Sequence, residues 1–89
     1  MTESEFNIGK ELLKSIKKAE DILESLAKMK SATKEKNFRA GLVAFIDDDE
    51  QGEICFTQND KKIFTEIMDK LIQEEERIIS SLKEQFDKL

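Results

Sequence analysis

Two long segments of the chain repeat apolar residues at alternating spacings of three and four, and no proline interrupts either of them. Such spacing places apolar side chains on one face of an α-helix and charged side chains on the other. The sequence therefore predicts a first amphipathic helix over about residues 3–30, which begins at a capping box formed by Thr2 and Glu5. Its apolar face comprises Leu12, Ile16, Ala19, Leu23 and Leu26.

The second segment predicts a helix over about residues 58–88, opened by a capping box of Thr57 and Asp60. Its apolar arc is wider than one partner helix can cover, so we expect a second copy to cover the remainder, with Ile79 on the outer ridge. The simplest such oligomer is a dimer that forms a four-helix bundle. The expected interface residues are Phe64, Met68, Leu71, Ile72, Ile78, Ile79, Leu82, Phe86 and Leu89.

Between the two helices the composition changes twice. Residues 31–37 are polar and predict a connector, whereas residues 38–57 contain two short β-prone runs around an acidic turn and predict a β-hairpin. The expected fold of the single domain, residues 1–89, is therefore α+β in αββα order: two long antiparallel helices connected by a hairpin. Since an isolated hairpin is marginal in water, it must pack on the helices or pair with a hairpin of another chain.

Charge is distributed unevenly along this chain of net charge −5. Residues 28–39 carry five basic side chains, and residues 40–60 carry six acidic side chains and no basic one. So short a basic stretch does not favour general nucleic-acid binding. Two interpretations of the residues around Phe38 remain open: a site for a small anionic ligand such as a nucleotide, with a base stacked on the ring, or a ring that caps the helical core. The residues of that possible ligand site are Lys34, Lys36, Phe38 and Arg39.

The acidic turn partly follows the spacing of a calcium-binding loop, with Asp47, Asp49 and Gln51 at ligand positions and Gly52 at the tight turn. The twelfth position, however, is Gln58, where such a loop needs a bidentate Glu. The flanking segments also resemble strands and not helices. We therefore expect a solvated hairpin tip and no metal site.

Glu75 lies where the two apolar ridges of the second helix cross. If facing positions of the antiparallel helices sum to about 90, Ser15 and Lys18 lie opposite it. A buried, paired carboxylate would fix the register and the oligomeric state, whereas a carboxylate at the edge of the helix contact would reach solvent. Cys55, in the second β-prone run, is expected to be a small buried hydrophobe.

Residue types restrict the chemistry open to the chain. Histidine is absent and cysteine occurs once, which excludes Ser-His-Asp and Cys-His catalysis, zinc sites built from His and Cys, and an intramolecular disulfide. We therefore expect a protein that is not an enzyme and uses no cofactor. The sequence shows no targeting segment and no run long enough to span a bilayer, so we expect a cytoplasmic protein without a membrane partner.

The order of helix, short hairpin and long helix, with the terminal sequence from Ile78 to Leu89, resembles small uncharacterised proteins common in bacteriophage and prophage genomes. The resemblance is architectural and covers the whole chain. It implies an accessory role, either in inhibiting host enzymes or in sequestering defence signals. From the residues and this resemblance we expect an interaction protein that binds and blocks or organises a host macromolecule, and we keep a binder of a small anionic ligand as the alternative.

Overall fold

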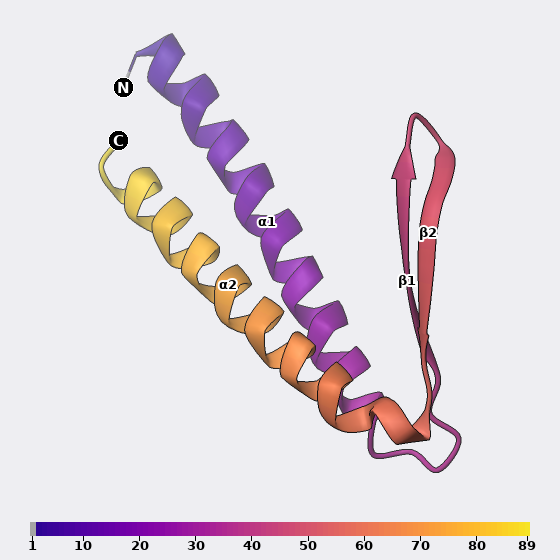
Figure 1. The fold of residues 1–89 in the computed structure, drawn as a ribbon. Helices are drawn as coiled ribbons and strands as arrows, with labels where there is room; N and C mark the ends of the chain where they lie inside the picture. Colours follow the sequence, from indigo (N-terminus) through magenta and orange to yellow (C-terminus); the bar gives the residue numbers. More distant parts are fainter. Residues whose placement is uncertain (1) are drawn as a thin grey trace.

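The computed structural model describes residues 2–89 and confirms the αββα order. Its elements are helix α1 (Glu3–Ala32), strands β1 (Ala40–Ile46) and β2 (Asp49–Phe56), a 3₁₀ turn η1 (Gln58–Asp60) and helix α2 (Lys61–Asp87). α1 and α2 lie side by side and antiparallel, and the hairpin leaves the helix pair at the end where α1 stops and α2 begins (Figure 1). The architecture is therefore a helical hairpin with a β-hairpin inserted at its closed end.

Both helices begin at the caps expected from the sequence. The Thr2 hydroxyl accepts a hydrogen bond from the Glu5 backbone N–H at 3.1 Å. The Asp60 carboxylate accepts one from the Thr57 backbone N–H at 3.0 Å. The second cap opens the 3₁₀ turn η1, so the α-helix proper begins at Lys61, three residues later than predicted.

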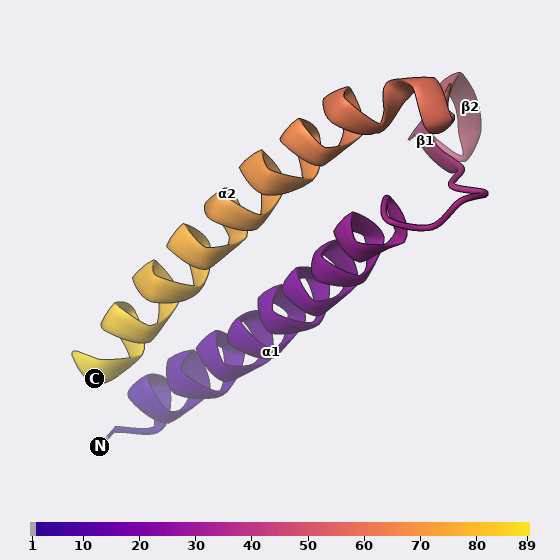
Figure 2. The ribbon, with the colours of Figure 1, turned by 90° about the horizontal axis from the view of Figure 1, so that it is seen from below.

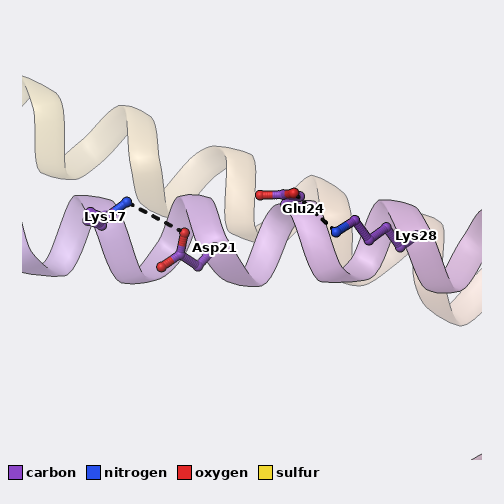
Figure 3. Close-up of polar contacts among 4 residues, drawn as sticks. All are labelled: Lys17, Asp21, Glu24 and Lys28. Carbon is purple, nitrogen blue, oxygen red and sulfur yellow. Dashed lines mark ion pairs between the residues drawn. The ribbon is translucent and has the colours of Figure 1, made fainter.

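The outer face of α1 is a solvated row of charges. Lys17 Nζ lies 3.9 Å from Asp21 Oδ1, and Lys28 Nζ lies 3.2 Å from Glu24 Oε1 (Figure 3). All four side chains are well exposed, and exposed pairs at this spacing contribute only a few tenths of a kcal/mol each. This face supports the helix and the solubility of the chain; its charges are paired locally along the helix.

The main hydrophobic core lies where the helices meet the hairpin. Phe64 and Met68 in the first turns of α2 are fully buried, and Leu26 of α1 packs in the same cluster. The Phe64 ring centroid lies 5.0 Å from that of Phe38 and 5.4 Å from that of Phe56. Tilted ring pairs at these distances add to the gain from burial. The core thus ties the connector and the end of β2 to the helix pair.

Away from this core, only a few side chains are buried between the two helices. Ile16 and Ala19 of α1 and Ile79 of α2 are buried there. Lys30 pairs with Asp69, so these facing residue numbers sum to 99. Near the open end, a methyl group placed on Gly9 would lie 3.3 Å from Leu89 and 3.5 Å from Phe86 (sums of 98 and 95). The register differs from the expected sum of about 90.

The hairpin is an antiparallel pair that leaves the closed end of the helix pair at an angle (Figure 1). Ala40 pairs with Phe56 at its base and Ile46 with Asp49 at its tip, with a bulge in β2 opposite the Ala44/Phe45 step. Asp47 and Asp48 form the turn with φ of 49° and 67°. Two successive positive φ values are typical of the type I′ turn, in which Asp and Asn are favoured. Figure 2 shows the strands nearly end-on at the closed end of the helix pair, beside the start of α2.

Candidate interaction surfaces

The apolar arc of α2 divides into a covered centre and an open edge. Phe64, Met68 and Ile79 are buried within the chain, so the expectation that Ile79 lies on an outer ridge is wrong. Leu71, Ile78 and Leu89 remain exposed, at 41%, 43% and 37%. The remaining expected interface residues, Ile72, Leu82 and Phe86, are half-buried.

The division follows from helix geometry. Leu71 and Ile78 are spaced by seven residues, which returns a helix to nearly the same face. Leu89 lies beyond the end of α2, beside Gly9 of α1. α1 covers the neighbouring face, where Met68 and Ile79 lie. The single helix α1 is too narrow to cover both, so an apolar row along α2 faces solvent.

α1 also leaves apolar side chains uncovered. Phe6 and Leu13, seven residues apart on one face, are 61% and 53% exposed. They line an open groove at the free end of the helix pair together with Gly9 and the half-buried Phe86. Both helices therefore carry exposed apolar side chains beside their mutual contact.

Glu75 is half-buried at the level of the helix contact. Because facing residue numbers sum to 95–99, Glu75 lies level with residues 20–24 and not with Ser15 or Lys18 as expected. Within residues 2–89 no ion pair or side-chain hydrogen bond of Glu75 is formed. Of the two interpretations of this residue, the structure of one chain fits a carboxylate at the edge of the contact.

The charged side chains of the basic connector are exposed, but its aromatic ring is buried. Lys34, Lys36 and Arg39 are exposed, whereas Phe38 is only 4% exposed and packs on Phe64. Of the two interpretations left open by the sequence, the structure therefore fits a Phe38 that caps the core, and its ring is not exposed for a base to stack on. The Gln58 side chain donates hydrogen bonds to the Glu35 and Lys36 carbonyls and fastens the connector to η1.

The acidic segment forms the hairpin turn and not a calcium loop. The chain reverses at Asp47 and Asp48, and Asp49 already belongs to β2. In the described part of the chain, no group of three or more His, Cys, Asp or Glu side chains is arranged to hold a metal ion. The carboxylates are exposed to solvent at the tip.

The expectation that Cys55 is buried is wrong. Cys55 is exposed, and its Sγ lies 3.5 Å from Glu53 Oε1. Successive strand residues point to opposite faces, so the burial of Phe56 directs Cys55 outward. That alternation, read from the terminal Phe of the run, was the signal available in the sequence.

For the hairpin the sequence left two outcomes open, packing on the helices or pairing with another chain, and within one chain only its base packs on the helices. Each residue of the hairpin is exposed except Ala40 and Phe56 at the base. The apolar side chains left in solvent are Leu42, Val43, Phe45, Ile46 and Ile54, at 38–62% exposure. A strand that alternates apolar and polar residues has a face for solvent, but β1 contains no polar side chain from Ala40 to Ile46. That uninterrupted run was the signal for a strand in need of a partner.

Known proteins give no indication of function for this chain, so its function is inferred from its structure. In the part of the chain that the structure describes, no helix combines the length and apolar content needed to cross a bilayer. Comparisons with protein-family models, with curated proteins and with solved structures find no match to this chain.

Proposed function

We propose that the chain is a non-enzymatic interaction protein that acts as a homo-oligomer, most simply a dimer, and binds and blocks or organises another macromolecule. The observation that supports this is the surface that one chain leaves open. Its accessible surface is 7120 Å², whereas a compact folded monomer of this mass has about 5,400 Å². The difference exceeds the roughly 800 Å² that each partner contributes to a standard interface.

The shape of the chain agrees with the area. The radius of gyration is 17.1 Å, compared with about 12 Å for a compact domain of this length. Among residues 2–89, thirteen large hydrophobic side chains are exposed and eight hydrophobic residues are buried. These exposed side chains lie on both helices and on the hairpin, and exposed apolar patches are typical of interaction sites.

In the proposed dimer, the open row of α2 supplies the helical contact. Leu71 and Ile78 lie on one face along the helix and can meet the same row of a second copy in a four-helix bundle. A contact of this kind is isologous, since the same patch serves both subunits. Glu75 lies beside this row, where the second copy can supply the partner that one chain lacks.

The mass of the protein in solution tests the proposal. Light scattering at micromolar concentration should give twice the mass of one chain, and Ile78→Glu should lower it toward that of one chain. Gln73→Glu, which places the same charge on the exposed polar face of α2, is the matched control and should leave the dimer intact. A parent protein with the mass of one chain would refute the homo-oligomer.

For the alternative function, binding of a small anionic ligand, the connector offers exposed cations but no exposed aromatic ring on which a base could stack. A thermal-shift panel of nucleotides separates the two functions, because a ligand that binds the folded state raises the melting temperature by mass action. We expect no shift. A clear rise that Arg39→Ala abolishes would favour the ligand binder.

The macromolecular partner is best sought in the proposed setting of the cytoplasm, where reducing conditions would keep exposed Cys55 a free thiol. Affinity capture from a bacterial lysate should be run with the parent and with Ile78→Glu in parallel. A partner that the dimer binds should be retained by the parent and lost by the variant. Equal capture by both would show that binding does not need the dimer.

A further inference from the structure

The hairpin has two free edges of different character. β1, from Ala40 to Ile46, carries no charged side chain over its whole length. β2 carries Asp49, Glu50 and Glu53, all exposed. Charged side chains on an edge strand oppose pairing with another strand, and an uncharged edge invites it. Of the two edges, the β1 edge is therefore the one open to a further strand.

The charges that flank β1 have opposite sign at its two ends. Lys36 and Arg39 precede the strand at the base, and the acidic turn that begins at Asp47 follows it at the tip. Over the length of β1 the two groups are separated by about 20 Å. This exceeds the Debye length of about 8 Å at physiological salt, so within one chain they hardly attract each other. Both groups are available to a partner.

A second copy of the chain matches this pattern only in the antiparallel orientation. If two β1 strands pair antiparallel about Val43, then Arg39 of each copy faces Asp47 of the other, because facing residue numbers sum to 86. A parallel pair would bring base against base and tip against tip, with like charges together. Directly opposed charges of opposite sign stabilise an antiparallel pair, and like charges destabilise it.

We propose that the β1 edges of two copies pair antiparallel about Val43 and join the two hairpins into one four-stranded sheet. This rests on the homo-oligomer proposed above and names one of its contacts, separate from the helical row of α2. A two-stranded sheet alone is marginally stable in water, and two further strands remove that weakness. The hairpin leaves the closed end of the helix pair at an angle, with β1 nearer the helices than β2 (Figure 1). Every residue of β1 after Ala40 is exposed, which leaves the strand accessible to the second copy.

Disulfide linking tests the pairing with a control that the chain itself provides. In the proposed sheet, Val43 of one copy lies directly opposite Val43 of the other, and opposed side chains in antiparallel strands have Cβ atoms about 5 Å apart. Cys55→Ser combined with Val43→Cys should therefore link the two chains in a glutathione redox buffer. The parent carries its one exposed cysteine on β2, away from the paired edge, and should stay largely unlinked.

Charge reversal tests the orientation. In the linking background, Arg39→Glu places a carboxylate opposite Asp47 of the other copy, twice in the dimer, and should reduce linking several-fold. Asp47→Asn removes the acidic partner and keeps a residue type that accepts the positive φ of this turn position. With both substitutions in one chain, no like charges face each other in the antiparallel pair, so linking should recover.

Recovery in the double variant would show that Arg39→Glu does not prevent folding. Equal linking through Val43→Cys and native Cys55, or no recovery in the double variant, would overturn the pairing. If light scattering still finds a dimer in that case, the homo-oligomer stands and only the hairpin contact is refuted. A parent with the mass of one chain refutes both.

Discussion

The two ends of the hairpin contain similar apolar residues in opposite surroundings. At the base, Phe56 is 7% exposed and packs on Phe64. At the tip, Phe45 and Ile46 are 62% and 61% exposed. The strand conformation is the same at both ends, so what differs is the presence of a packing partner. The apolar side chains at the base are therefore buried within one chain, whereas those at the tip need a further partner.

The largest effect is expected from a substitution in the core at the base of the hairpin. Phe64→Ala removes the ring that Phe38 and Phe56 contact, and should lower the free energy of unfolding by about 4 kcal/mol. Phe45→Ala, at the open end, is the matched control and should cost little in one chain. Urea unfolding followed by circular dichroism measures both. Similar losses for the two variants would remove the distinction between the ends.

A second pair of variants compares the covered and open faces of α2. Ile79→Asp places a carboxylate in the helix contact and should lower the stability by about 3 kcal/mol. Ile78→Asp, one residue away and 43% exposed, should preserve helix content in one chain and weaken association. Thermal unfolding and light scattering separate the two effects. If Ile78→Asp unfolds the chain more than Ile79→Asp, the assignment of the two faces is wrong.

A smaller effect is expected where the hairpin passes into α2. Asp60→Ala removes the carboxylate that accepts from the Thr57 backbone N–H, and should cost about 1 kcal/mol. Asn59→Ala, at an exposed neighbouring position, serves as the control. Urea unfolding should show the midpoint lowered for Asp60→Ala alone. An unchanged midpoint would show that the cap contributes nothing to the junction.

The smallest effect is expected at the ion pair between the helices. Lys30 and Asp69 are 45% and 52% exposed, so Asp69→Asn should cost only a few tenths of a kcal/mol. High salt should narrow the difference from the parent further, because exposed pairs are screened. A loss above 1 kcal/mol in thermal unfolding would mean that the helix contact depends on charge more than on its buried apolar side chains.

The order of the elements could be predicted from the sequence because it depends on local signals. Apolar periodicity of three and four, the caps at Thr2 and Thr57, and the acidic turn each act over a few residues. The register of the helices could not be predicted, because it depends on how the connector and β2 pack against α2 in the aromatic core. In the observed register, the numbers of facing residues sum to 95–99, so Glu75 does not lie opposite Ser15 or Lys18.

The candidate surfaces were harder to predict for the same reason. Ile78 and Ile79 are adjacent and equally apolar, and only the position of α1 decides which one is buried. Phe38 follows basic residues in the sequence, yet its ring enters the core since the chain turns there toward Phe64. The apolar pattern of the sequence identifies the residues that favour burial. Which of them are buried within one chain depends on the tertiary structure.

The most direct measurement of the central claim, that a second copy completes the surface one chain leaves open, is thermal unfolding over a wide range of protein concentration. When folding is coupled to dimerisation, the melting temperature rises with concentration by mass action. We expect a steady rise for the parent and a weaker dependence for Ile78→Glu. A melting temperature of the parent that stays constant over about a hundredfold range of concentration would contradict the account.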